Sequence, residues 1–124
     1  MRRTTLLLTS ALTLGACRST TMPIAYCTAP ASVSVVVTAT DSITGVPVAD
    51  SATGVVQDGA YRDSLRFEPS SDELAAGNRV GTFAITIDRP RYQPWVRNGV
   101  RVSQVGPCGN VIPVRVAARL QPLP

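Results

Sequence analysis

The sequence predicts an all-β fold, a two-sheet β-sandwich of about seven short strands with one short helical turn in a loop. Three observations support this prediction. Apolar and polar residues alternate with a period of two in most segments after residue 31. Glycine, proline and aspartate separate these segments at short intervals. Hydrophobic residues make up 44% of the 124 residues and charged residues 16%, a composition typical of a folded domain.

The first predicted strand covers residues 32–40. Apolar side chains at positions 33, 35, 37 and 39 share one face of this strand, and serine and threonine occupy most of the other. Residues 41–47 contain aspartate, glycine and proline, which favour a turn. The next extended run, residues 48–57, is interrupted at Gly54, where we expect a bulge.

The Asp-Gly dipeptide at 58–59 predicts a hairpin. After it, bulky apolar residues alternate with polar ones over residues 61–67, which predicts another strand. Residues 70–73 have the pattern of a capping box, and the glycine at 77 can end a helical turn. We therefore expect the one short helix inside this loop.

Residues 82–87 alternate strictly and predict the next strand, with Phe83, Ile85 and Ile87 facing inward. Trp95 is the only tryptophan and is expected to anchor the core. A cation–π contact of Trp95 or Tyr92 in carbohydrate binding is the alternative. The last two extended runs are 96–105 and 111–121; Pro113, which lacks an N–H donor, is expected at a strand start or on an edge.

The first sixteen residues predict a leader that is removed. Two arginines precede an apolar stretch of eleven residues, about 16 Å long as a helix. A bilayer core needs about 20 apolar residues, so the stretch is typical of a signal peptide and not of a membrane span. The sequence Leu-Gly-Ala-Cys at 14–17 resembles the lipobox of bacterial lipoproteins. The resemblance implies that Cys17 becomes the mature N-terminus and carries a diacylglycerol and an acyl chain; a plain secreted protein is the alternative.

These features predict three parts: a signal peptide at 1–16, a lipidated cysteine and tether at 17–30, and the β-sandwich domain at 31–124. Several acyl chains hold a domain to a membrane durably, where a single chain does not. The expected location is therefore the cell envelope. If the host has two membranes, Arg18 resembles the default signal for outer-membrane sorting, with the domain on the periplasmic or the surface side.

Two further cysteines, Cys27 and Cys108, remain in the exported part of the chain. An even number of cysteines in an oxidising compartment favours a disulfide between them. Two free thiols or a redox role are the alternatives. No Cys-x-x-Cys pair supports redox chemistry, so a structural bridge is the preferred prediction.

Two short motifs resemble carboxypeptidase regulatory-like domains. One is Asp-x-x-Thr-Gly-x-Pro-Val at residues 41–48; the other is Gly-x-Phe-x-Ile-x-Ile at 81–87, followed by Pro-x-Tyr at 90–92. The similarity covers about residues 31–121 and implies a transthyretin-like, immunoglobulin-like sandwich that is generally non-catalytic. Arg91 stands where the family usually has glycine, so we expect the turn before Tyr92 to use a different backbone conformation.

Composition excludes several kinds of chemistry. The chain has no histidine, which excludes a histidine base, a histidine-bearing zinc site and Ser-His or Cys-His nucleophiles. The acids in the middle of the chain lack the Asp-x-Asp-x-Asp-Gly spacing of a calcium loop and are interpreted as solvated loop charges. We expect no catalytic residues, metal or cofactor. The net charge of +4 falls to +2 when Arg2 and Arg3 leave with the leader, which argues against a nucleic-acid partner.

The last two runs are expected to form a hairpin that turns about Cys108, so that residues whose numbers sum to 216 face each other. This register places Arg101 opposite Arg115, and Arg97 opposite Arg119, on the outer face. The corresponding inner-face pairs are Val100 with Val116, Val102 with Val114, and Val96 with Leu120. Opposed like charges are destabilising. An anionic partner relieves this repulsion, or the register differs, or the guanidinium groups splay into water.

We hypothesise that these four arginines bind anionic envelope material such as lipid headgroups or glycan phosphates; a solvated face is the alternative. The sequence as a whole predicts a non-catalytic envelope lipoprotein that presents a β-sandwich interaction module at the membrane surface. Its expected partners are the membrane, through the lipid anchor, and an envelope protein or glycan. The alternative function is a glycan- or anion-binding module that uses the arginine-rich face. An unrecognised hydrolase is a third hypothesis, without a defensible set of residues.

Overall fold

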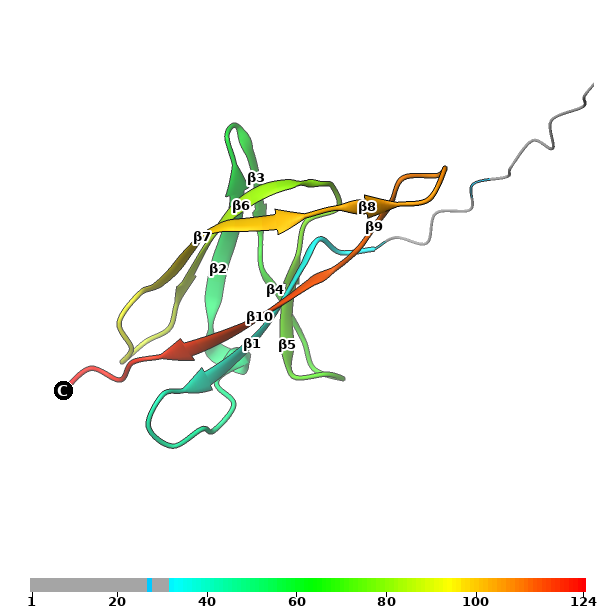
Figure 1. Ribbon diagram of the computed structural model, residues 1–124. Helices are drawn as coiled ribbons and strands as arrows, with labels where there is room; N and C mark the ends of the chain where they lie inside the picture. Colours follow the sequence, from blue (N-terminus) through cyan, green and yellow to red (C-terminus); the bar gives the residue numbers. More distant parts are fainter. Residues whose placement is uncertain (1–26, 28–31) are drawn as a thin grey trace, which may run out of the picture.

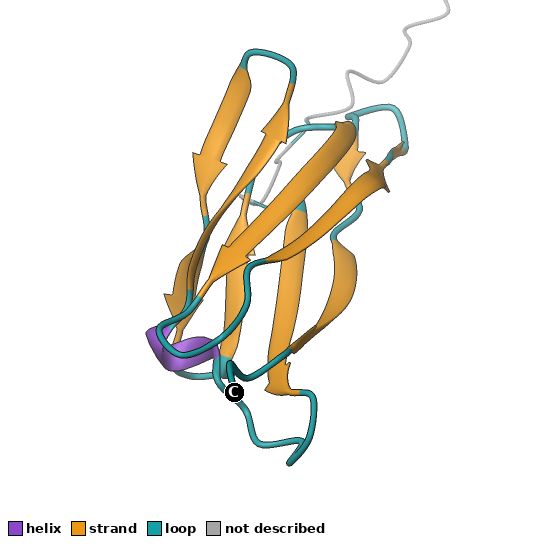
Figure 2. Cartoon of the chain, turned by 90° about the vertical axis from the view of Figure 1, so that its left-hand side faces the viewer, coloured by secondary structure: helices purple, strands orange, loops and turns teal. Residues whose placement is uncertain are grey.

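Two four-stranded sheets pack face to face in the computed structural model, which describes Cys27 and residues 32–124 (Figures 1 and 2). The β1 sheet has the order β10-β1-β5-β4, and the β2 sheet has the order β3-β2-β6-β7. The strands of the β1 sheet are β1 (Val35–Asp41), β4 (Arg66–Glu68), β5 (Glu73–Ala76) and β10 (Val114–Leu120). Those of the β2 sheet are β2 (Thr53–Asp58), β3 (Tyr61–Ser64), β6 (Gly81–Asp88) and β7 (Trp95–Val102). The predicted all-β, two-sheet sandwich is confirmed.

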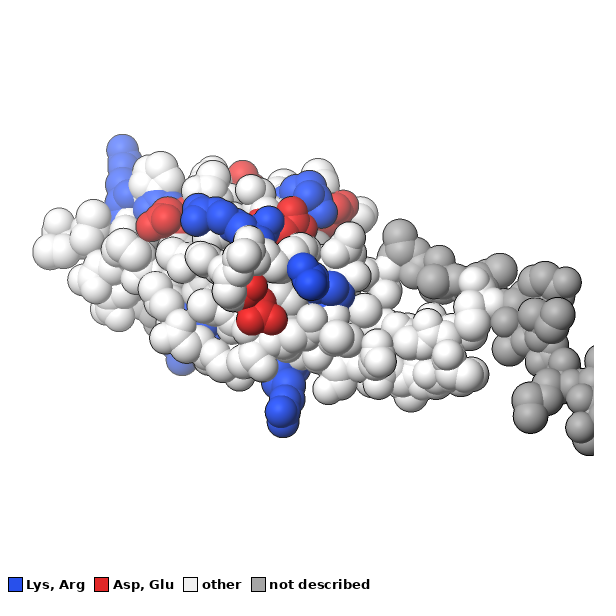
Figure 3. Space-filling model, turned by 90° about the horizontal axis from the view of Figure 1, so that it is seen from above, with Lys and Arg blue, Asp and Glu red and all other residues white. Residues whose placement is uncertain are grey.

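A two-stranded ribbon of β8 (Gln104–Val105) and β9 (Asn110–Val111) extends from one end of the sandwich (Figure 1). Neighbouring strands in both main sheets are antiparallel, except that β1 and β10 are parallel. Among the described residues, no helix is long and apolar enough to cross a membrane. Figure 3 shows the charged side chains over the body of the sandwich, while the ribbon end, at the right, is white in this view.

The core lies between the two sheets and is built by alternation. Val35 and Val37 of β1 and the three predicted residues of β6 are fully buried, as the period of two requires. Phe83 packs edge-on against Tyr61, with ring centroids 5.9 Å apart. Trp95 is half-buried and packs at the border of this core, so it contributes to the core without being enclosed by it.

The predicted strand over residues 61–67 is divided between the two sheets. It runs as β3 in the β2 sheet, breaks at Leu65 and continues as β4 in the β1 sheet. At the break, the backbone N–H of Leu65 donates to the carbonyl oxygen of Gly54 at 2.8 Å. A Cβ at position 54 would overlap the carbonyl oxygen of Thr86 and lie 2.8 Å from Leu65 Cδ1. Glycine is thus required at position 54 because the backbone of Thr86 and the side chain of Leu65 approach it closely. The bulge predicted at Gly54 is wrong, because β2 pairs regularly with β6.

The short helix lies elsewhere than predicted. Residues 70–73 form no helix; the segment is the turn of the β4–β5 hairpin, and Glu73 already belongs to β5. Asp72 has a φ of 57°, in the left-handed region, which is incompatible with a right-handed helical turn. The one helical turn is the 3₁₀ helix η1 (Ala49–Ser51), which replaces the first part of the extended run expected over 48–57.

The hairpin predicted about Cys108 forms only at its tip, and the register that sums to 216 is wrong. Gln104 pairs with Val111, and Val105 pairs with Asn110. Beyond them β7 pairs with β6, while β10 runs parallel to β1. Pro113 has no N–H with which to extend the ribbon, and the N–H of Val114 instead donates to the carbonyl oxygen of Ser34, just before β1, at 2.9 Å. Proline therefore marks the start of β10, as predicted.

Candidate functional site

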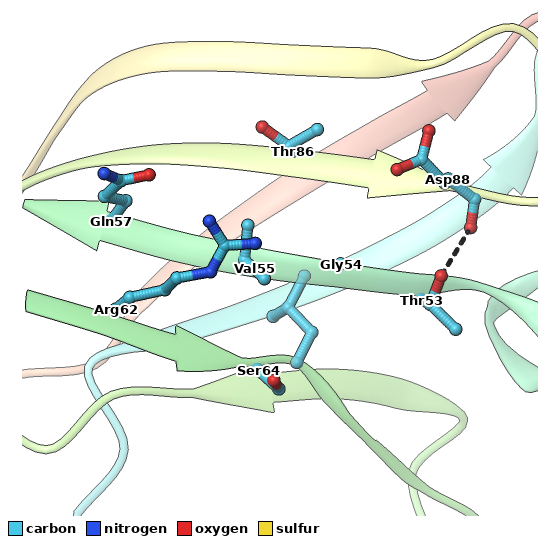
Figure 4. A pocket seen from close by; sticks show the side chains of 9 residues that line it. Thr53, Gly54, Val55, Gln57, Arg62, Ser64, Thr86 and Asp88 are labelled. Carbon is cyan, nitrogen blue, oxygen red and sulfur yellow. Dashed lines mark hydrogen bonds between the residues drawn. The ribbon is translucent and has the colours of Figure 1, made fainter.

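A shallow hollow of about 530 Å³ lies on the outer face of the β2 sheet (Figure 4). Its position follows from the register: Val55 lies beside Ser64 on one side and Thr86 on the other, while its neighbour Val56 points into the core. Short side chains on the three strands therefore leave a concave floor. The lining residues are Thr53, Gly54, Val55, Gln57, Arg62, Ser64, Leu65, Thr86 and Asp88.

One charge of each sign lies at the border of the hollow. Arg62 extends from β3 toward Val55, whereas Asp88 lies at the end of β6 beside Thr53 (Figure 4). The hydroxyl of Thr53 donates to the backbone carbonyl of Asp88 at 3.5 Å, which leaves the carboxylate available. Neither Arg62 nor Asp88 takes part in an ion pair within the part of the chain that the structure describes. Arg62 can thus donate hydrogen bonds to a ligand in the hollow, and the carboxylate of Asp88 can accept them.

Two of the four predicted arginines share the outer face of the β1 sheet. Arg115 and Arg119 alternate with buried residues of β10, so both point outward. Arg115 forms an ion pair with Glu73 of β5, with Nη1 2.6 Å from Oε1. Arg119 donates to the carbonyl oxygen of Ser42 at 3.0 Å. Both guanidinium groups therefore have partners within the chain.

The other two arginines lie on opposite faces of β7. Arg101 pairs with Thr82 on the outer face of the β2 sheet. Arg97 pairs with the buried Ile85 and shares its face, but it is exposed because β7 is the edge strand. The guanidinium carbon of Arg97 lies 5.3 Å from the ring centroid of Trp95. The change of face comes from a bulge, because β7 has one more residue than β6 between the pairs on either side of it.

The four arginines therefore do not form the single outer face that the sequence predicted. β7 and β10 belong to different sheets, and the bulge turns Arg97 away from Arg101. The bulge also exposes Val96, which was expected inside: its exposed fraction is 57%. Binding of anions by any of these arginines stays a prediction.

The disulfide between Cys27 and Cys108 is present, as predicted, with the two Cα atoms 5.4 Å apart. Cys108 lies in the turn between β8 and β9, where Gly106 and Gly109 both have positive φ. The bridge attaches the N-terminal part of the chain to the ribbon end of the sandwich. Cys17, the leader and the rest of the tether lie outside the described residues.

A buried carboxylate, Asp41, whose role the sequence patterns did not predict, organises the loop after β1. Asp41 Oδ1 accepts the backbone N–H groups of Ile43 at 2.7 Å and Thr44 at 2.9 Å. Asp41 Oδ2 accepts the hydroxyl of Tyr92 at 2.7 Å. The N–H of Thr44, the Tyr92 hydroxyl and the N–H of Ile43 together lower the pKa of Asp41 from 3.8 to about 2.

The two motifs quoted for the family resemblance meet in this contact. Asp41 opens the first motif and Tyr92 closes the second, but their separation of 51 residues does not by itself predict the hydrogen bond. Arg91 has a φ of 73°, in the left-handed region that glycine favours. The turn before Tyr92 thus has a glycine-type conformation despite the arginine, contrary to the expectation.

The fold and these surfaces define a small disulfide-bonded β-sandwich with a polar hollow on one sheet. No protein-family model matches the chain, and no curated protein matches it. Within Cys27 and residues 32–124, no three histidine, cysteine, aspartate or glutamate side chains are grouped so that they could hold a metal ion.

Proposed function

We propose that the chain is a non-catalytic lipoprotein of the cell envelope that presents its β-sandwich as an interaction module at the membrane surface. The leader and the Leu-Gly-Ala-Cys sequence ending at Cys17 support the anchor. The Cys27–Cys108 bridge is consistent with an oxidising compartment outside the cytoplasm. The hydrogen bond between Asp41 and Tyr92 supports a structural role for the two motifs of the carboxypeptidase regulatory-like resemblance.

The hollow on the β2 sheet carries the proposed interaction. Its floor of short side chains can receive side chains that protrude from a partner, and its border offers Arg62 and Asp88 without internal ion pairs. The two charges cancel, so the hollow does not attract a polyanion by net charge. Complementary charges of both signs are typical of a protein surface. The hollow therefore favours an envelope protein over an anionic glycan as the partner.

Lipidation is tested by labelling the intact protein with radioactive palmitate in its host. The wild-type protein should incorporate label, and Cys17→Ala should abolish incorporation. Cys27→Ser serves as the matched control. Cys27 lies outside the lipobox, so its replacement should leave the label on Cys17 unchanged. Absence of label in the wild type, or undiminished label in Cys17→Ala, would contradict the lipoprotein proposal.

The hollow is tested with a photo-crosslinking amino acid in the lipidated protein. Thr86 lies in the hollow, and Thr38 is an exposed threonine of β1 on the outer face of the opposite sheet. Crosslinking from position 86 should give one discrete protein adduct that position 38 does not give. Adding Arg62→Gln should lower its yield several-fold, whereas Arg66→Gln, a control on β4, should not. Identical adducts from positions 86 and 38 would contradict the proposal.

A further inference from the structure

The end of the sandwich formed by β8, β9 and their turn has no charged residue. All thirteen residues from 102 to 114 are uncharged. We name residues 103–113 the hairpin tip. Two aliphatic side chains protrude from it, Val105 with an exposed fraction of 57% and Ile112 with 46%. Apolar side chains that protrude from an uncharged tip are suited to the boundary between lipid headgroups and acyl chains.

The disulfide places the hairpin tip at the end of the chain that would carry the lipid. Cys27 is bound to Cys108 within the tip, and ten residue steps separate Cys17 from Cys27. A fully extended segment of that length spans at most about 35 Å. Without the bridge, every surface of the domain could approach the membrane. With it, the hairpin tip is the part of the domain joined to Cys17 by the shortest length of chain.

The opposite end of the sandwich lies farther from the anchor. The seven residues of β10 carry the chain away from the hairpin tip by about 23 Å. At its far end, the carbonyl oxygen of Leu120 accepts the N–H of Ser42, which begins the loop 42–47. That loop also exposes two aliphatic side chains, Ile43 with an exposed fraction of 76% and Val46 with 56%. Exposure alone does not distinguish the two ends; the position of the disulfide does.

Arginines flank the uncharged stretch on both sides. Arg101 is the last charged residue before the hairpin tip, and Arg115 is the first after it. Arg115 is paired with Glu73, but Arg101 is exposed and takes part in no ion pair among the described residues. An arginine beside an apolar tip can reach the phosphates of lipid headgroups while its stem covers apolar surface.

We propose that the hairpin tip lies against the lipid surface, with Val105 and Ile112 at the acyl-chain boundary and Arg101 on headgroup phosphates. This inference rests on the proposed lipid anchor at Cys17. It fixes how the domain faces its surroundings: the loop 42–47 points away from the membrane, and the hollow opens along the side of the sandwich. The hollow then remains accessible to a partner at the membrane surface.

The experiment uses the lipidated full-length product in vesicles of phosphatidylcholine with phosphatidylglycerol. A photo-crosslinking amino acid replaces Val105 in one variant and Val46 in the other, a matched pair because both valines are equally exposed at opposite ends. Palmitate on Cys17 is measured in the same samples. Position 105 should give at least five times as much lipid adduct as position 46.

The outcomes separate the two proposals. Palmitate-labelled protein with equal lipid adducts from both positions, or more from position 46, would overturn the orientation while leaving the anchor intact. Absence of palmitate would overturn the anchor itself. Arg101→Gln should lower the adduct from position 105 several-fold in the anionic vesicles but not in phosphatidylcholine alone. An unchanged yield in both would overturn the assignment of Arg101 to headgroup phosphates.

Discussion

The two ends of the sandwich are stabilised by different interactions. At the ribbon end an uncharged turn is fixed by a covalent bond between Cys27 and Cys108. At the opposite end the loop after β1 is fixed by hydrogen bonds to the ionised carboxylate of Asp41. The stability of the first end should therefore respond to redox conditions and hardly to pH, whereas that of the second should respond to pH and not to reductant.

The carboxylate contact also connects the C-terminal segment to the loop end. Tyr92, whose hydroxyl donates to Asp41, forms an isolated β-bridge with Pro122. The next residue, Gln93, donates its N–H to the carbonyl oxygen of Gln121 at 2.8 Å. Through its side chain and its backbone, Tyr92 therefore links the loop after β1, the turn after β6 and the last residues of the chain. Loss of the contact between Asp41 and Tyr92 should destabilise all three segments.

Removing the bridge should have the largest effect. We expect the double variant Cys27→Ser and Cys108→Ser to lose about 2–4 kcal/mol of unfolding free energy, because the unfolded chain gains the freedom that the bridge removes. Urea denaturation at pH 7 measures the loss. Dithiothreitol should destabilise the wild type by a similar amount and leave the double variant unchanged. Equal stability of the oxidised wild type and the double variant would contradict a structural role for the bridge.

Replacing Asp41 with asparagine should have the next largest effect and should alter the pH dependence. The folded pKa of Asp41 is about 2 and its ordinary pKa is 3.8, so its stabilisation is present above about pH 4. It is lost as the pH falls through the folded value. The difference in stability between wild type and Asp41→Asn should therefore be constant from pH 5 to 8 and shrink between pH 4 and 2. Thermal unfolding across this range measures it; a constant difference down to pH 2 would contradict the account.

Tyr92→Phe should have a smaller effect, because Asp41 keeps its two backbone donors. The pKa of Asp41 should rise from about 2 toward 3.8 without reaching it, as measured by NMR titration of the carboxyl carbon. The hydrogen bond to Asp41, with burial, raises the pKa of Tyr92 above its ordinary 10.0. In the wild type this contribution is therefore present below pH 10 and lost as the pH rises above it. Tyr61→Phe is the matched control and should leave the pKa of Asp41 unchanged.

Local patterns predicted much of the fold. Alternation identified the buried residues of β1 and β6, and the Asp-Gly dipeptide at 58–59 predicted the β2–β3 hairpin. The disulfide followed from counting cysteines in an exported chain. These predictions succeeded because each depends on neighbouring residues or on composition, and tertiary packing agreed with them.

Most failures concern interactions that the local pattern does not contain. The capping box at 70–73 is a valid helix signal, but pairing of β5 with both β1 and β4 outweighs it. Residues 61–67 were predicted to form one strand, yet the chain changes sheet at Leu65. The hollow depends on which strands become neighbours, which the sequence does not reveal. The one missed signal is Asn98-Gly99 inside β7, a dipeptide that marks the bulge separating Arg97 from Arg101.

The smallest effect is expected from the two matched valines, and it separates stability from surface function. Val105→Ser and Val46→Ser each remove a side chain that is more than half exposed, so each should change the unfolding free energy by less than about 0.5 kcal/mol. If the hairpin tip contacts lipid, Val105→Ser alone should weaken the protection of the tip against hydrogen exchange when vesicles are present. Val46→Ser should leave that protection as in the wild type. Equal protection of the tip in both variants would mean that Val105 does not contact lipid. The ribbon end would then differ from the loop end only in its disulfide.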